Sequence, residues 1–357
     1  RKEKRQQVRE GAAAPFRLRE RVKKKYLDAA KPIPSAFKLE SASVTAAAFV
    51  GANNRSGRRR TYTLRELCGS GSKLRFKYVP WDGITPTPVV DKADRVISVL
   101  AGRPEDDDWD RMELLGREAI ESRRSRLSIH KNDRTHRRGA FPAVRCGVSH
   151  GQGPTCPHNL GNPDKNAEVV DELNNMEPFR RLSGFASSVM ASWAPALYDY
   201  YTECLGALYS EHPGLKRIFP SSVFAAASYN FGPRTACFKH TDFLNLPFGW
   251  CAVTAFGDFD PTKGGHLVLW DLGLVIEFPP GSTILLPSAV VAHSNVPVSK
   301  SETRYSFAQY TAGGIFRWVE NKFQLQADYH ASLSEEERAR AMARNEARWA
   351  YGLSMFS

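Results

Sequence analysis

The sequence lacks a long hydrophobic run, a close pair of cysteines and an excess of acidic residues. No apolar stretch approaches the roughly 18 to 20 residues of a membrane-spanning helix, so these residues predict no such helix and we expect no membrane partner. The six cysteines form no C-x-x-C pair and no short disulfide framework. Their spacing excludes a small disulfide-rich domain and favours a reducing compartment.

The strongest zinc alternative in the chain is the set Cys146, His150, Cys156 and His158. Its spacing matches no common zinc finger, and glycines and prolines crowd the segment. We therefore interpret these residues as part of a loop rather than as a metal site.

Basic residues outnumber acidic ones by 50 to 38, and the formal net charge of +12 favours a polyanionic partner. One cluster covers residues 1–28 and is typical of a solvated helical face or of a nuclear localisation signal, so we expect a nuclear protein. A second runs from Arg123 to Arg138 and leads into the glycine-rich segment 139–161, where backbone can approach a ligand closely. We expect phosphate contacts there, with Arg137 and Arg138 among the substrate-binding residues.

A possible metal site begins at His240, the only one of the nine histidines that is followed two residues later by a carboxylate, Asp242. On extended backbone such residues point to the same side and can bind one ion. His293 lies among short apolar runs broken by turns and is the expected third ligand. Two imidazoles and one carboxylate leave three positions open on an octahedral ion, as in non-haem Fe(II) oxygenases.

Such oxygenases commonly use 2-oxoglutarate, whose distal carboxylate fits a guanidinium fork and a hydroxyl donor. Arg304 follows His293 by eleven residues, and Ser306 projects from the same strand face. The same count from His266 reaches Glu277, which would repel the carboxylate, so His266 is interpreted as a packed strand histidine. We expect Fe(II), 2-oxoglutarate and O2 as the cofactor and co-substrates.

Two further residues are candidates for the other carboxylate of 2-oxoglutarate. Arg234 lies six residues before His240, and Asn230 offers an amide. A structural role at the end of a strand is the open alternative for each.

The pattern of short apolar runs predicts an α+β protein whose core is a double-stranded β-helix, or jelly roll. The expected strands of this core are 223–229, 250–256, 266–270, 274–278, 283–286, 290–293 and 304–310. Helices are expected near 112–120, 167–174 and 182–209, and a capping box of Ser334 and Glu337 predicts one more near the C-terminus. The expected divisions are a basic arm and linker (1–60), a strand and helix extension carrying the basic glycine-rich loop (61–220), the catalytic core (221–325) and a C-terminal helix (326–357).

Several motifs together resemble the TET/JBP-like dioxygenases that expanded with transposons in mushroom-forming fungi. They are N-F-G-P-R-T-A-C-F-K-H-T-D (230–242), G-W-C-A-V-T-A-F-G-D-F-D-P-T-K-G-G-H-L (249–267), F-P-P-G-S-T-I-L-L-P-S-A-V-V-A-H-S-N (278–295) and T-R-Y-S-F-A-Q-Y (303–310), with R-R-G-A-F (137–141), G-V-S-H-G-Q-G (147–153) and L-A-G-R-P (100–104) upstream. The R-x-S of Arg304 and Ser306 is similar to the TET pattern. AlkB-type enzymes have a second arginine where this chain has Tyr310, although Asn230 resembles AlkB. The long Cys-rich region of animal TET enzymes is absent.

The resemblance implies oxidation of methylated bases in DNA, of 5-methylcytosine to 5-hydroxymethylcytosine and beyond, with demethylation of N6-methyladenine as a further activity. A base inside a duplex has to flip into such a pocket. Asn245 and Asn159 are candidates for hydrogen bonds to the flipped base and Phe243 for stacking on it, with loop capping or packing as the alternative.

We expect a monomer that binds methylated DNA. Two rival classes stay open at this point. The first is a 2-oxoglutarate dioxygenase that acts on protein or on a small molecule, for which the net charge is incidental. The second is a non-catalytic, transposon-derived DNA-binding module.

Overall fold

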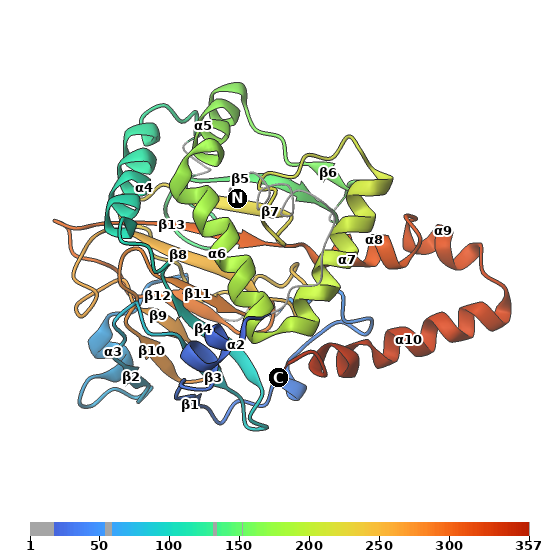
Figure 1. The fold of residues 1–357 in the computed structure, drawn as a ribbon, viewed down its shortest axis with the longest axis horizontal. Coiled ribbons are helices and arrows are strands. Elements are labelled where there is room, and N and C mark those ends of the chain that lie inside the picture. The colour runs from blue at the N-terminus through green and yellow to red at the C-terminus, as the bar shows by residue number, and fades with distance from the viewer. Residues whose placement is uncertain (1–17, 54–58, 131–133, 152, 357) are drawn as a thin grey trace.

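Two β-sheets face each other and form the centre of the molecule (Figure 1). The computed structural model describes residues 18–53, 59–130, 134–151 and 153–356. Most of the basic segment 1–28 therefore lies outside the described residues, which show only α2 (Glu20–Val22) and the π-helical turn η1 (Lys23–Leu27) of it.

The larger sheet has nine strands in the order β1-β3-β4-β11-β8-β13-β7-β5-β6. Their bounds are β1 (Ile33–Pro34), β3 (Thr87–Val90), β4 (Val96–Gly102), β11 (Thr283–Leu286), β8 (Cys251–Asp258), β13 (Thr303–Tyr310), β7 (Ala226–Asn230), β5 (Ala143–Ser149) and β6 (His158–Asn159). The smaller sheet has the order β12-β9-β10-β2, with β12 (His293–Asn295), β9 (Leu267–Leu269), β10 (Leu274–Ile276) and β2 (Lys77–Val79).

The chain winds back and forth between the two sheets. It runs from β7 in the large sheet to an extended segment around His240 beside β12, then to β8 in the large sheet, β9 and β10 in the small one, and so to β11, β12 and β13. Antiparallel pairing joins the core strands within each sheet. This alternation makes the core a double-stranded β-helix, so the predicted fold class is confirmed.

Apolar side chains fill the space between the sheets because alternate residues of each strand face inward. Leu267, Leu269, Leu274 and Ile276 of the small sheet pack there against residues such as Ile284 of the large sheet. The opposite face of the small sheet, with Val268 and Val275, packs under the short helix α3 (Leu64–Cys68). Both faces of the small sheet are thus covered.

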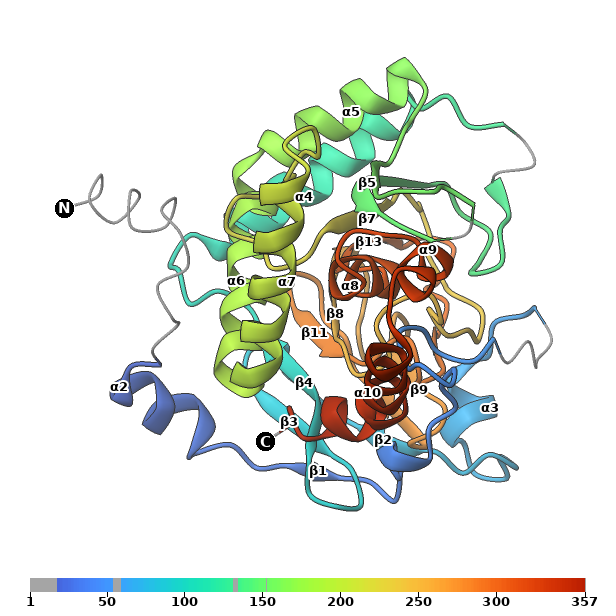
Figure 2. The ribbon, with the colours of Figure 1, turned by 90° about the vertical axis from the view of Figure 1, so that its right-hand side faces the viewer.

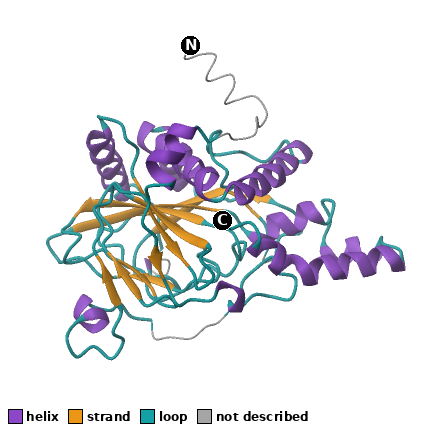
Figure 3. Cartoon of the chain, turned by 60° about the horizontal axis from the view of Figure 1, so that its bottom comes forward, coloured by secondary structure: helices purple, strands orange, loops and turns teal. Residues whose placement is uncertain are grey.

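Helices cover the outer face of the large sheet, and Figure 3 shows most of the helices along one side of the strands. They are α4 (Trp109–Arg124), α5 (Asp164–Asn175), α6 (Glu177–Trp193) and α7 (Pro195–Glu211). The break between α6 and α7 occurs at Pro195, because proline lacks the N–H that would continue the helix. Phe179 of α6 contacts Tyr229 and Phe307 of the sheet edge to face.

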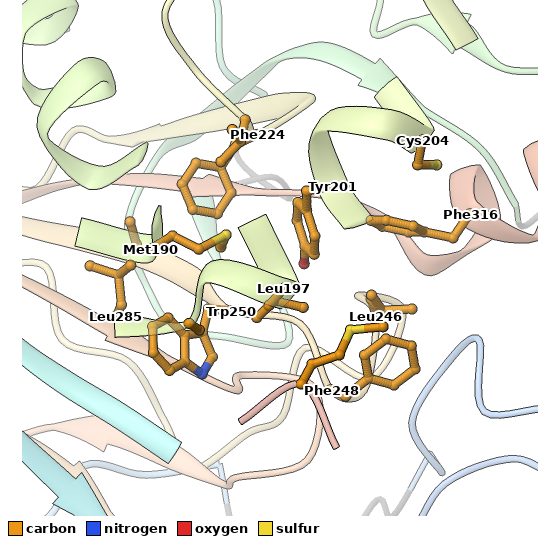
Figure 4. Packing of buried hydrophobic residues seen from close by; sticks show 14 of the residues in the cluster. Met190, Leu197, Tyr201, Cys204, Phe224, Leu246, Phe248, Trp250, Leu285 and Phe316 are labelled. Atoms are coloured by element: carbon orange, nitrogen blue, oxygen red, sulfur yellow. The ribbon is translucent and has the colours of Figure 1, made fainter. Parts of the chain in front are cut away.

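A second apolar cluster joins α7 to α8 (Gly313–Glu320) and α10 (Glu335–Leu353). These two helices and α9 (Gln326–Ala331), which lies between them in the chain, face the viewer in Figure 2. Figure 4 shows Tyr201 between Phe224 and Phe316 in this cluster. The predicted capping box of Ser334 and Glu337 begins α10 and is confirmed.

Two segments differ from the predicted organisation. Residues 33–53, predicted as part of an arm and linker, contribute β1 to the large sheet and bury Leu39 and Phe49. The glycine-rich segment 139–161, predicted as a loop, contains β5, which pairs with β7. Its glycines masked the strand pattern in the sequence. Within the described residues, no helix combines the length and apolarity needed to cross a bilayer.

The contact between helices and large sheet makes a prediction about stability. Phe307 is fully buried among Phe179, Phe219 and Tyr229. Phe307→Ala should lower the free energy of unfolding by about 3–5 kcal/mol, because it leaves a cavity between rigid elements. Met342→Ala on exposed helix surface should change it by less than about 0.5 kcal/mol. Denaturant unfolding measures both; equal effects would contradict this packing.

Candidate metal centre

Backbone hydrogen bonds bring His240 and His293 together. The N–H of His240 donates to the carbonyl of His293 over 3.1 Å, and that of His293 donates back to His240 over 2.9 Å. The two residues therefore form a directly opposed antiparallel pair with ring centroids 4.3 Å apart. Asp242 completes the set, and one ligand atom from each of the three residues lies within 4.8 Å of the others.

Both imidazoles are held in one tautomer by the backbone. Nδ1 of His240 lies 2.8 Å from the carbonyl of Phe238, and Nδ1 of His293 lies 2.9 Å from that of Val291. A carbonyl only accepts, so each Nδ1 carries the proton and donates it. Each Nε2 is left with a lone pair, and each lies 3.8 Å from an oxygen of Asp242. This is the outer-shell arrangement typical of metal-binding histidines.

Asp242 is held by two arginines. Arg138 donates from Nε to Oδ1 over 2.8 Å, and its Nη2 lies 2.7 Å from the same oxygen. Arg137 donates to the carbonyl of Thr241 over 3.0 Å and lies 3.5 Å from Oδ1. The segment of Arg138 is placed there by a hydrogen bond from the N–H of Phe238 to its carbonyl. It thus extends the small sheet beyond the His240 segment.

The charges of the site favour a bound cation. Burial, together with the neighbouring His293, lowers the pKa of His240 to about 3, and burial also lowers the pKa of His293. Burial alone would raise the pKa of Asp242, but Arg138 and the two histidines outweigh it and hold that pKa below its ordinary value. At neutral pH the site therefore presents two neutral imidazoles and a carboxylate.

These residues fit a divalent metal of the non-haem iron type, which takes two imidazole nitrogens and one carboxylate oxygen. Among the described residues, no other group of three histidine, cysteine or acidic side chains brings its ligand atoms this close. The zinc alternative is excluded on the same ground, since Cys146 instead contacts the amide of Asn174. His266 does not join the site either.

Arg304 places a positive charge between the sheets, and no acidic side chain among the described residues pairs with it. The residue is 1% exposed. Its Nη1 donates to the carbonyl of Thr235 over 3.0 Å, and its Nε has no hydrogen-bond partner among the described residues. No acidic side chain of the described residues lies within salt-bridge distance of it. Burial lowers the pKa of Arg304 to about 10, so it stays charged at neutral pH. A buried, unpaired guanidinium is costly unless an anion binds it.

Ser306 and Asn230 adjoin this arginine. Ser306 follows Arg304 on the same face of β13 and stands opposite Asn230 of β7, whose Nδ2 donates to its hydroxyl over 2.8 Å. The hydroxyl proton is thereby directed away from Asn230 and is available to a ligand. Gly257 stands opposite Arg304 on β8, where a Cβ would lie 2.2 Å from the carbonyl oxygen of Thr303. Glycine therefore lets β13 approach closely at Arg304.

Two predicted site residues, Arg234 and Asn159, have side chains that bind elsewhere in the protein. Arg234 is exposed, and its guanidinium donates to the carbonyl of Lys300 over 3.2 Å, which is the structural role at a strand end. Asn159 bridges Gly214 and Lys216 through its amide. It lies on β6, at the end of β5 opposite to the end that pairs with Asn230. Neither side chain is brought to the metal ligands.

Asn245 and Phe243 lie beside the metal ligands. The N–H of Asn245 donates to the carbonyl of Asp242 over 2.8 Å, and its side chain donates to Ser288 over 3.2 Å. Phe243 is half-buried, with the Arg137 guanidinium 5.4 Å from its ring centroid. Both residues lie in the turn that directly follows the H-x-D motif.

The sequence reasoning missed the position of Arg138. We predicted a contact with phosphate, but its guanidinium lies on Asp242, 104 residues further along the chain. Arg123 and Arg126 of the same basic cluster likewise bind Glu172 of α5. Spacing carries no signal for such long-range pairs, and much of this cluster is therefore neutralised within the protein.

Comparisons with known proteins give fold neighbours only. Neither a protein-family model nor a curated protein matches the chain. Among solved structures, NgTET1 in complex with 5mC DNA has 14% identity and a TM-score of 0.47 over 67% of this chain and 83% of that one. An oxidoreductase of the 2OG-Fe(II) oxygenase family from Burkholderia pseudomallei has 14% identity and a TM-score of 0.31, over 65% and 84% of the two chains.

The viral collagen prolyl hydroxylase vCPH from Paramecium Bursaria Chlorella virus-1, in its 2OG complex, has 13% identity and a TM-score of 0.20, over 24% and 57% of the two chains. All three TM-scores lie below 0.5. The assignment of the double-stranded β-helix therefore rests on the strand order of this chain, and that of the metal ligands on their geometry.

His266 gives a test of the site's boundaries. It is fully buried, neither ring nitrogen has a hydrogen-bond partner among the described residues, and burial lowers its pKa to about 4. As pH falls from about 6.5 to about 4, the unfolded chain takes up a proton that the folded chain does not, so stability falls by up to about 1.4 kcal/mol per pH unit. His266→Leu lacks this group, so between pH 6.5 and pH 4 its free energy of unfolding should fall by about 3 kcal/mol less than that of the wild type. Denaturant unfolding of metal-free protein measures it, and a pH-independent difference would contradict the buried neutral histidine.

Proposed function

We propose that this protein is an Fe(II)- and 2-oxoglutarate-dependent dioxygenase that oxidises the methyl group of modified bases in DNA. The observation that carries the proposal is the pairing of a buried His240–Asp242–His293 set with a buried, unpaired guanidinium. The segment that leads to His240 links the two: its Thr235 carbonyl accepts a hydrogen bond from Arg304 over 3.0 Å, and its Cys237 carbonyl accepts one over 3.2 Å from the N–H of Asn295, two residues after His293. A cation site and an anion site within one interior fit a metal-chelating carboxylic acid.

Each residue has a definite task in this proposal. His240, His293 and Asp242 would hold Fe(II), with Arg138 fixing the rotation of the carboxylate. Arg304 and the hydroxyl of Ser306 would bind the distal carboxylate of 2-oxoglutarate, and Asn230 orients that hydroxyl. When bound, iron, 2-oxoglutarate and O2 supply the oxidation: one oxygen atom enters a substrate C–H bond and the other enters succinate as CO2 leaves.

DNA as the substrate is supported by the net charge of +12 and by the motifs that resemble TET/JBP-like enzymes. A methylated base flipped out of the helix is small enough to reach the interior. Asn245 and Phe243, in the turn directly after Asp242, would offer an amide and a ring to such a base. We propose 5-methylcytosine as the substrate, with stepwise oxidation, and N6-methyladenine as a second one.

The remaining assignments belong to the same proposal. Membership of the transposon-associated mushroom group, a nuclear location and a monomeric state stay predictions from the sequence. Arg234 and Asn159 have no part in the mechanism proposed here, because their side chains are engaged elsewhere.

The test is direct turnover. Protein with Fe(II) and 2-oxoglutarate is incubated with duplexes that carry 5-methylcytosine, N6-methyladenine or no modification, and nucleosides are identified by mass spectrometry while succinate is quantified. We expect 5-hydroxymethylcytosine in step with succinate. His240→Ala should abolish the product without loss of duplex binding, whereas the matched variant His330→Ala should keep the wild-type yield, because His330 lies on α9 and not in the β-sheet core.

Other outcomes assign the rival classes. If succinate forms with a protein or a small molecule but with none of the duplexes, the protein is a dioxygenase whose substrate is not DNA. Duplex binding without succinate under any condition would leave a non-catalytic binding module. Full activity of His240→Ala would contradict the metal site itself.

A further inference from the structure

Two adjoining hollows lie at the far edge of the small sheet, away from the metal ligands. One, of about 700 Å³, is lined by Gly69, Ser72, Lys73, Arg75 and neighbouring residues of the segment 68–76. The other, of about 520 Å³, is lined by residues of the segments 60–66 and 70–74. Both are formed by α3 and the loop that leads into β2.

This surface is strongly basic. The residues 59–77 contain six cationic side chains, all exposed, and one carboxylate: Arg59, Arg60, Arg65, Lys73, Arg75, Lys77 and Glu66. Glu66 is paired with Arg60 at 2.7 Å. Arg65, Lys73 and Arg75 make no salt bridge with any described residue. Unlike the cluster near Arg123, this one keeps its charge for an external partner.

Aromatic rings interleave with cations across the same face. The guanidinium of Arg60 lies 3.8 Å from the ring centroid of Tyr62, which lies 4.8 Å from Trp270. Lys239 covers Trp270 at 4.7 Å, and Phe76 contacts its edge at 5.4 Å. The row therefore runs from the neighbour of His240 to the hollows.

Arg75 is held in place at a conformational cost. Its φ is 50°, in the left-handed region that non-glycine residues rarely adopt. The hydroxyl of Ser72 accepts hydrogen bonds from the N–H groups of Leu74 and Arg75, at 3.1 and 3.4 Å, and stabilises this turn. The loop thus presents two neighbouring cations, Lys73 and Arg75, from a defined backbone.

We propose that this surface, residues 59–77 with Lys239 and Trp270, binds the phosphate backbone of duplex DNA that flanks the base in the active site. The proposal rests on the proposed function for its choice of DNA. Exposed arginine and lysine side chains are the groups that neutralise DNA phosphates and position a protein on the duplex.

The distance to the site gives the length of flank required. Four strand spacings separate the His240 segment from β2, through β12, β9 and β10. At about 4.8 Å each this is about 19 Å, or about five to six nucleotides at 3.4 Å per step. A duplex whose modified base has a shorter flank on that side does not reach the hollows.

The test compares two triple variants that remove the same charge. Arg65→Gln/Lys73→Gln/Arg75→Gln changes the proposed surface; the control, Arg111→Gln/Lys165→Gln/Arg180→Gln, removes one exposed cation from each of α4, α5 and α6 on the opposite side of the molecule. Binding of an unmethylated 30-base-pair duplex is followed by fluorescence anisotropy over a range of salt concentrations.

We expect the surface variant to bind about five- to tenfold more weakly, and its slope of log K against log salt to shrink by about 2 to 3. The control should lose less than about twofold. In turnover assays the surface variant should lose activity on the 30-base-pair substrate but keep it on a substrate with three-nucleotide flanks.

Equal losses in both variants would overturn the proposal in favour of a general charge effect. Binding of poly-glutamate is measured in parallel. If the surface variant keeps the wild-type salt slope on DNA but no longer binds poly-glutamate, the surface binds an acidic protein instead. The anisotropy arm needs no catalysis, so failure of turnover alone contradicts the proposed function and not this surface.

Discussion

A positive charge enclosed between two sheets, with no acidic side chain among the described residues to balance it, is the constraint on which the account of this protein depends. Arg304 is 1% exposed and its Nε lacks a partner. A folded chain tolerates such a charge only at a cost of several kcal/mol, and a bound carboxylate offsets that cost. Because the His240–Asp242–His293 set shares the same interior, one molecule could meet both demands of the proposed site: a carboxylate at Arg304 and a chelating group at a bound metal.

The winding of the chain explains how distant residues come together. Most passes move between the sheets, with β9 and β10 the exception, so strands far apart in sequence become neighbours. β13 supplies Arg304 and Ser306 from the large sheet, while β12 supplies His293 and the segment paired with it, between β7 and β8, supplies His240. The helices on the outer face of the large sheet bury its other side chains, such as Phe307, and keep β13 in position. Packing outside the barrel therefore supports geometry inside it.

Local patterns made the core predictable from sequence. The strand 283–286 and the capping box at Ser334 were predicted with their observed bounds, since each depends on a few adjacent residues. Long-range pairs were not. Arg138 was expected to face DNA, yet it binds Asp242, and no periodicity links residues 104 positions apart. Glycines interrupted the sequence pattern of the strand β5, so it was not predicted. The side chain of Arg234 points to solvent because of the backbone geometry at the end of the strand, which a count of residues cannot predict.

The most direct measurement is an anaerobic titration of 2-oxoglutarate into Fe(II)-loaded protein, followed by the visible charge-transfer absorption of iron chelated by a 2-oxo acid. Wild-type protein should develop this band saturably. Arg304→Met should need about ten- to a hundredfold more 2-oxoglutarate, the value of a charge-assisted hydrogen-bonded pair, with unchanged Fe(II) affinity. No band in wild type, or equal 2-oxoglutarate affinity in both proteins, would contradict the claim that the buried guanidinium binds the carboxylate of an iron-bound acid.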